Sequence, residues 1–262
     1  MATYKHKHSI LFGDGTLQNG KFKGYDTYDD WHLIPASRPT IGMPGVETKF
    51  VAIPGRDGSI DLSDFLTGNR PAFGDRSGTF EFYVENDYDP DSRPEEFWMT
   101  IYPKIVNQIH GKKIKMVFPE DDPDYYWEGR VTVDKYEPGD GTHSNVSISY
   151  AFGPYKRKIR KISEGMVWDN FNFEKDYDHD PLHLESIQVT GNISKTIWGD
   201  GYPFPITLSC LSGPVSARFN ESEVLVQSGE TVQMGHAEYG LNTIYLSSDN
   251  AVVSIDWRGG SL

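Results

Sequence analysis

Four segments in the first part of the chain alternate strictly between apolar and polar residues. A β-strand places successive side chains on opposite faces, so this pattern is typical of an antiparallel sheet with one buried and one polar face. The first part of the chain is therefore predicted to form a β-sheet domain. The apolar sets are Phe80, Phe82 and Val84; Ile114, Met116 and Phe118; Trp127, Val131 and Val133; and Val146, Ile148, Tyr150 and Phe152.

One stretch follows the helical period instead and predicts a helix over about 93–110. Ser92 and Glu95 have capping-box spacing, and Gly111 is a typical stop signal. Pro103 lies inside the stretch and cannot donate a backbone hydrogen bond, so a kink or a split is expected there. The apolar residues on the expected buried face are Trp98, Ile101, Tyr102, Ile105 and Ile109.

A second block of short alternating runs begins at about residue 185, with glycines and polar turns between the runs. Short strands at roughly regular spacing predict a β-sandwich. We therefore expect a mainly β fold with an N-terminal domain over 1–158, a linker or belt over 159–184 and a C-terminal sandwich over 185–262. The runs are Ile187 and Val189; Ile206, Leu208 and Cys210; Val224 and Val226; Ile244 and Leu246; and Val253, Ile255 and Trp257.

Composition narrows the class of protein. The single cysteine rules out an intrachain disulfide, and no signal peptide or apolar membrane-spanning run is evident, so we expect a soluble protein without a membrane anchor. The net charge of −13 argues against nucleic-acid binding, which needs clustered Lys and Arg. The one basic cluster, Lys156–Lys161, is interpreted as a solvated linker, with DNA binding as the alternative.

The search for catalytic chemistry finds no nucleophile elbow, P-loop, zinc-protease motif or dinucleotide fingerprint. The acidic run Glu120–Asp124 is typical of a hairpin loop, although an acidic catalytic cluster is the alternative. Cys210 alternates with apolar residues, which favours a core position over a nucleophile. We therefore predict no catalytic residue and no enzymatic activity.

Three groups have partial metal-ligand spacing, and each has a simpler interpretation. Asp87, Asp89 and Asp91 match the start of a calcium loop but lack its glycine and its closing glutamate, which favours an acidic turn. The loop 178–183 and the pair His6 and His8 carry too few ligands for a closed zinc site. The sequence predicts no metal and no cofactor.

Aromatic residues in the second block offer a different kind of site. Trp198, Tyr202, Tyr239 and Trp257 are candidates for stacking on sugars, if they are exposed. Packing in the core or in an interface is the alternative for each of them.

Several motifs, taken in order, resemble the distal tail proteins of siphophages and prophages of Gram-positive bacteria. The similarity covers about residues 29–156, and the last motif below resembles the ends of those family members that carry a galectin-like or carbohydrate-module-like sandwich. The motifs are DDWHLIPASRP (29–39), VAIPGRDGSIDLSDFLTG (51–68), SGTFEFYV (77–84), QIHGKKIKMVF (108–118), DPDYYWEGRVTV (122–133), VSISYAFGPYK (146–156) and VVSIDWRGGSL (252–262).

The resemblance implies a fold and a role. The N-terminal domain would be β-barrel-like, similar to a tail tube protein, with one flanking helix, and would close as a homohexameric ring. The ring would join the tail tube to the tail-tip hub in the virion, after assembly in the bacterial cytoplasm. Further partners would be the tape-measure protein and receptor-binding proteins, and DNA would pass through without specific binding.

A ring of identical copies needs surfaces that bind copies of the same chain. The loop Gly55, Arg56, Asp57 and Gly58 lies between two alternating runs, which predicts a hairpin tip and a candidate interface, with an ordinary surface turn as the alternative. Trp31 and His32 of the first motif are further candidates. Two other functions remain open: a carbohydrate-binding module for host recognition, with Trp198, Tyr202 and Tyr239 as its contacts, and a cell-wall hydrolase.

Overall fold

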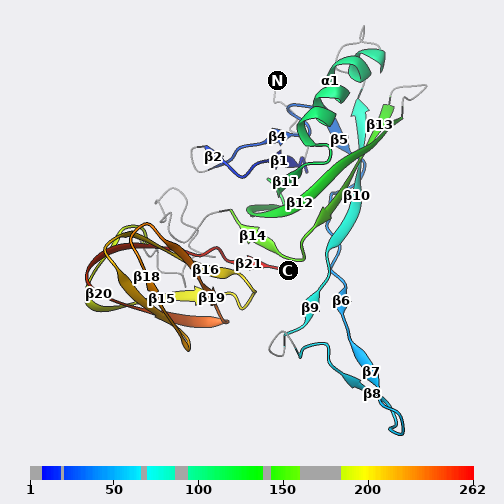
Figure 1. The fold of residues 1–262 in the computed structure, drawn as a ribbon. Helices are drawn as coiled ribbons and strands as arrows, with labels where there is room; N and C mark the ends of the chain where they lie inside the picture. The colour runs from blue at the N-terminus through cyan, green and yellow to red at the C-terminus, as the bar shows by residue number, and fades with distance from the viewer. Residues whose placement is uncertain (1–7, 19–20, 66–69, 86–93, 138–142, 160–183) are drawn as a thin grey trace. The chain divides into compact units, whose positions relative to one another are not determined.

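The computed structural model describes residues 8–18, 21–65, 70–85, 94–137, 143–159 and 184–262. The fold is mainly β, with one helix in the described residues, as the sequence predicts. The chain divides into two compact units, which we describe separately (Figure 1). Unit 1 comprises residues 1–156 with Leu262, and unit 2 comprises residues 157–261.

Unit 1 is built around a barrel-like antiparallel sheet with the strand order β4-β1-β11-β12-β13-β10-β5. Strands β10 and β13 pair over their whole length, from Arg76 opposite Phe152 to Glu85 opposite His143. The strands are β1 (Leu11–Gly13), β4 (Tyr25–Asp26), β5 (Leu33–Pro35), β10 (Arg76–Glu85), β11 (Lys113–Phe118), β12 (Asp122–Glu137) and β13 (His143–Phe152).

The alternating residues of these strands point into one hydrophobic core, as predicted. Phe82, Met116, Val131 and Ile148 are almost completely buried and belong to the same cluster. Because each side chain removed from water stabilises the fold by roughly 1.5–3 kcal/mol, this shared face fixes the register of the strands.

The predicted helix is α1 (Pro94–Ile109), which packs on the same core through Phe97, Ile105 and Ile109. The expected split at Pro103 does not occur. The carbonyl that Pro103 leaves without a donor belongs to Met99, and both residues are exposed, so water can satisfy that carbonyl.

One residue of the helix was misplaced by the sequence pattern. Trp98 was expected on the buried face, but its side chain is about half exposed and stacks on Tyr102 with 4.9 Å between ring centres. Phe97 takes the buried position instead, because it lies four residues before Ile101 and eight before Ile105 on one line of the helix surface. The capping residue Ser92 lies outside the described residues.

The other strands of unit 1 form small two-stranded ribbons outside the main sheet. β2 (Leu17–Gln18) pairs with β3 (Lys21–Phe22). The remaining ribbons are formed by β6 (Val46–Glu47) with β9 (Ala72–Phe73), and by β7 (Phe50–Ala52) with β8 (Ser59–Asp61).

Unit 2 is a six-stranded antiparallel sheet with the order β18-β17-β20-β16-β19, in which β15 also pairs with β20. Its core contains the predicted alternating runs, including Cys210, which is buried as expected. The strands of this sheet are β15 (Ile187–Gly199), β16 (Pro205–Ser212), β17 (Val215–Phe219), β18 (Ser222–Val226), β19 (Thr231–His236) and β20 (Gly240–Asp256). The short strands β14 (Lys156–Lys158) and β21 (Gly260–Ser261) pair with each other and are not strands of this sheet.

The finer parts of the predicted architecture stay predictions. These are the similarity of unit 1 to a tail tube domain and the similarity of unit 2 to a galectin-like sandwich. The predicted linker over 159–184 falls almost entirely outside the described residues. In the basic cluster, Arg157 is exposed as expected, whereas Lys156 is partly buried, 2.6 Å from Asp122 and over the ring of Tyr125.

Candidate functional site: an exposed arm in unit 1

A narrow ribbon, which we call the arm, leaves the main sheet of unit 1 after β5 and returns to it at β10. Its described residues are 43–65 and 70–73, and it contains β6, β7, β8 and β9. In Figure 1 these strands extend beyond the end of β10 as two long, paired segments. Both strand pairs are antiparallel, with Val46 opposite Phe73 and Val51 opposite Ile60. An isolated two-stranded ribbon has no further strand or helix packed against it, so its stability in water is marginal.

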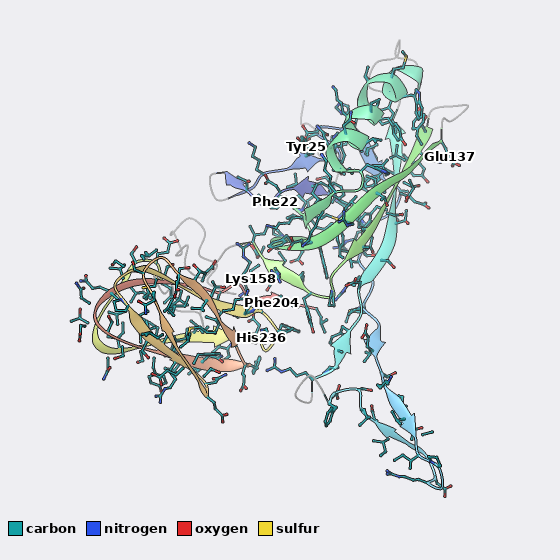
Figure 2. All side chains as sticks on the ribbon, viewed as in Figure 1. Phe22, Tyr25, Glu137, Lys158, Phe204 and His236 are labelled. Carbon is teal, nitrogen blue, oxygen red and sulfur yellow. The ribbon has the colours of Figure 1, made fainter. Side chains whose placement is uncertain are left out.

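The arm exposes large apolar side chains. Phe50 is 59% exposed and Phe65 is 77% exposed, whereas the core phenylalanines of unit 1 are less than 10% exposed. Figure 2 shows the side chains along β7 and β8 projecting from the ribbon on both sides. Several large apolar side chains exposed along one ribbon are typical of a protein interaction site. The other exposed apolar residues of the arm are Met43, Val46, Val51, Ile53 and Leu62.

Arg76 fixes the root of the arm. Its Nη1 donates to the carbonyl of Gly42, just before the arm, and its Nε donates to the carbonyl of Pro154, at 2.8 and 2.9 Å. The guanidinium also lies 4.6 Å from the ring centre of Trp127. Burial lowers the pKa of Arg76, and burial raises the pKa of the neighbouring Tyr150 despite the opposing charge of Arg76. Because Arg76 follows the arm and Gly42 precedes it, this clamp holds both ends together.

A second anchor holds the segment that leads into the arm. Asp121 accepts hydrogen bonds from Arg38 at 2.5 Å and from the ring of His8 at 2.9 Å. Burial acts to raise the pKa of Asp121, but the hydrogen bonds from Arg38 and His8 outweigh it and lower the pKa. Asp121 therefore serves as a structural ion-pair partner. The acidic run covers the turn of the predicted β11–β12 hairpin and the first residues of β12.

The predicted hairpin tip is present at the end of the arm. Gly55 and Gly58 have φ angles of 81° and 78°, in the left-handed region that favours glycine. Arg56 and Asp57 are exposed between them. The tip therefore offers a pair of opposite charges next to the apolar residues of β7 and β8.

The structure places the other two interface candidates differently. Trp31 is 1% exposed and lies in the core of unit 1, where it stacks on Phe12 and donates from Nε1 to Gln108. It therefore offers no exposed surface in the single chain. His32 is partly buried with a φ of 56°, and burial lowers its pKa although neighbouring acidic groups oppose this.

Two of the glycan candidates, Trp198 and Tyr239, lie together in unit 2. The rings of Trp198 and Tyr239 meet edge to face with 6.0 Å between their centres. A Cβ atom added at Gly201, the neighbour of Tyr202, would lie 3.1 Å from the Cβ of Tyr239. Tyr239 is strongly exposed, whereas Trp257 is buried in the core.

The remaining candidates add no site to the described residues. Burial raises the pKa of Cys210, whose thiol lies 2.7 Å from the carbonyl of Gly213. No group of three or more His, Cys, Asp or Glu side chains in the described segments could hold a metal ion, and α1 is not long and apolar enough to cross a membrane. The calcium-like loop, the loop 178–183 and His6 fall outside the described residues.

Sequence reasoning found the tip of the arm but missed most of its exposed apolar residues and its clamp. Contrary to the expectation of an alternating run before the tip, Phe50 and Val51 are adjacent apolar residues, and both are exposed. This break in the alternation is the signal that could have marked the arm. Arg76 is an even number of residues from Phe80 and Phe82, so extending the alternation of this strand to Arg76 would have placed it on the buried face.

The chain matches no protein-family model, and it matches no protein among those with curated descriptions.

Proposed function

We propose that the chain is a structural protein of a tailed bacteriophage, of the distal tail type, which works by closing into a ring with copies of itself. The observation that carries the proposal is the arm: a ribbon that is clamped at its root and exposes large apolar side chains among its described residues. Exposed apolar area is unfavourable in water by roughly 25 cal/mol per Å², so this surface favours a partner that covers it.

The geometry of the arm favours a copy of the same chain as that partner. Each chain carries one arm, and the arm cannot cover itself, because its strands β7 and β8 already pair with each other. If the arm of one copy binds a different surface of the next, the contact is heterologous, and such contacts close into rings when the rotation fits. The free edges of a ribbon also allow backbone pairing with a neighbouring strand.

The assignment to a phage tail rests on the ordered motifs, of which VAIPGRDGSIDLSDFLTG covers the tip and most of the distal half of the arm. On this proposal the ring is homohexameric, lies between the tail tube and the tail-tip hub, and catalyses no reaction. The net charge of −13 would limit adhesion of DNA during its passage. Tape-measure and receptor-binding proteins would be neighbours of the ring in the virion.

Electron microscopy of the purified full-length chain tests the proposal. We expect discrete rings with a central opening wide enough for duplex DNA. The variant with Phe50→Asp and Phe65→Asp should lose the rings and keep its circular dichroism spectrum, because both residues are exposed in the single chain.

Leu211→Asp in unit 2 is the matched control, since Leu211 is 54% exposed but lies outside the arm. This variant should still form rings. A chain that remains monomeric at high concentration with its arm intact would contradict the proposal, and so would rings that persist in the double arm variant.

A further inference from the structure

The start of helix α1 carries an aromatic cluster at the surface of unit 1. The ring of Trp98 lies 4.9 Å from the ring of Tyr102 and 4.9 Å from the ring of Tyr136, measured between ring centres. Trp98 is 48% exposed, and Met99, the next residue of the helix, is 75% exposed. We call Trp98, Met99, Tyr102 and Tyr136 the helix patch.

The core of unit 1 holds the rings of the helix patch in place. Tyr136 is buried and stacks on the core residue Phe97 with 5.7 Å between ring centres. Tyr102 lies 5.5 Å from Tyr136, and Trp98 packs on both tyrosines. Trp and Tyr side chains on a rigid support dominate the free energy of many protein associations. The helix patch therefore has the composition and the support of a protein-binding surface.

The exposed large apolar residues described in unit 1 gather in two places. Most of them belong to the arm, and Trp98 and Met99 form the second group. Tyr25 on β4 and Tyr83 on β10 are exposed as single residues. A heterologous contact needs two different surfaces on each copy, and the arm and the helix patch supply two.

The arm and the helix patch lie at opposite ends of β10 (Figure 1). The arm joins β10 at Arg76, whereas Tyr136 of the patch pairs with Val146, which pairs with Phe82. The six residues from Arg76 to Phe82 span about 20 Å of strand, and the arm extends away from the patch. One copy therefore cannot cover its own patch with its own arm, so the contact has to run head to tail between copies.

The charges around the two surfaces are complementary. Residues 97–115, which form α1 and the start of β11, contain four lysines and no acidic residue. Glu128 of β12 pairs with one of these, Lys113, at 3.3 Å. Residues 43–65 of the arm contain four acidic and two basic residues, a net charge of −2. Opposite charges of this kind select the partner and its orientation. The lysines are Lys104, Lys112, Lys113 and Lys115, and the acidic residues of the arm are Glu47, Asp57, Asp61 and Asp64.

We propose that the helix patch is the surface that binds the arm of the next copy. This inference rests on the proposed function and names the second surface of the ring contact. Phe50 and Phe65 of the arm pack against Trp98 and Met99, where the Met99 sulfur makes favourable contacts with aromatic rings. The acidic residues of the arm face the lysines of α1 and β11.

Mixing two variants that each lack one surface tests the inference. The arm variant carries Phe50→Asp and Phe65→Asp, and the patch variant carries Trp98→Ala and Met99→Asp. Each variant alone should stay monomeric in native mass spectrometry of the full-length chain. An equimolar mixture at high concentration should give a heterodimer and nothing larger, because only the arm of the patch variant and the patch of the arm variant remain to bind each other.

Two further variants act as controls. Tyr83→Asp should form rings as the natural chain does, because Tyr83 is 41% exposed in unit 1 but lies outside both surfaces. Met99→Asp alone changes a side chain that is 75% exposed, so it preserves the fold if Trp98→Ala does not. It should raise the protein concentration needed for ring formation by about tenfold or more. Every variant should keep the natural circular dichroism spectrum.

The possible results separate this inference from the proposed function. Rings in both the natural chain and the folded patch variant would overturn the inference alone, and so would a mixture that stays monomeric although the natural chain forms rings. Loss of rings in Tyr83→Asp would also count against the helix patch. A natural chain that stays monomeric would overturn the proposed function and this inference together.

Discussion

Two strands of unit 1 place the same residue types in opposite surroundings. Strand β10 and the arm strand β7 both contain Phe and Val. In β10, Phe80 and Phe82 are at most 5% exposed, because β13 and β5 lie beside the strand and the core lies below it. In β7, Phe50 is more than half exposed, and only β8 lies beside the strand.

The difference shows that the same residue type can stabilise either the folded chain or the association of two chains. Phe82 stabilises the folded chain, since folding itself removes its ring from water. Phe50 gains little from folding, so its ring contributes free energy only when another molecule covers it. Mutations that separate folding from association therefore test this comparison directly.

The largest expected effect is the difference in unfolding free energy between substitutions of the two phenylalanines. Phe82→Ala should lower the free energy of unfolding by about 3–5 kcal/mol, because it leaves a cavity in the core. Phe50→Ala should change the same quantity by no more than about 0.5 kcal/mol. Chemical denaturation at a protein concentration low enough to keep the chain monomeric measures both. Equal losses would show that Phe50 is buried within the single chain.

The clamp at the root of the arm should show the next largest effect. Arg76→Ala leaves the carbonyls of Gly42 and Pro154 without their donor and removes the contact with Trp127. We expect a loss of about 2–4 kcal/mol in unfolding free energy. Faster hydrogen exchange of backbone amides in the arm, with the far end of β10 unchanged, would show that the clamp acts on the arm.

One result for Arg76→Ala would contradict the role of Arg76 as a clamp. If Arg76→Ala unfolds as the natural chain does and self-associates normally, the arm is held by something other than Arg76.

The smallest effect concerns Asp121, which ties Arg38 and His8 together before the arm. Asp121→Asn should lower the unfolding free energy by about 1 kcal/mol near pH 7. The pKa of Asp121 is lowered in the folded chain, so the folded state holds this proton less tightly than the unfolded state. The stability that the carboxylate contributes is complete above its ordinary pKa of 3.8 and is lost as the pH falls through the lowered value.

The gap in stability between the natural chain and Asp121→Asn should therefore be constant at neutral pH and close below about pH 4. Denaturation curves collected from pH 7 down to pH 3 measure the gap. A gap that widens as the pH falls would contradict the assigned role of Asp121.

The sequence predicted the elements of the fold well, because burial in a sheet leaves a period of two in the chain. The runs that contain Phe82, Met116 and Ile148 all form core strands, and the one predicted helix forms. The error at Trp98 arose because an aromatic residue at the edge of a buried face fits the helical pattern as well as one in its centre.

The sequence could predict less of the candidate site. It located the hairpin tip at Gly55–Gly58, since glycines between two strand-like runs mark turns. Both glycines have positive φ angles in the structure. It could not show that the residues around the tip are exposed, because alternation does not reveal whether a second layer covers a strand. Trp31 illustrates the converse: its motif suggested an interface, whereas its ring fills the core.

Native mass spectrometry of the full-length chain, with and without Phe50→Asp and Phe65→Asp, tests the central claim most directly. We predict that the natural chain is detected as a closed multiple of its 29.6 kDa mass and that the arm variant is detected as a folded monomer. A natural chain of 29.6 kDa at every concentration tested would contradict the claim that the arm binds another copy.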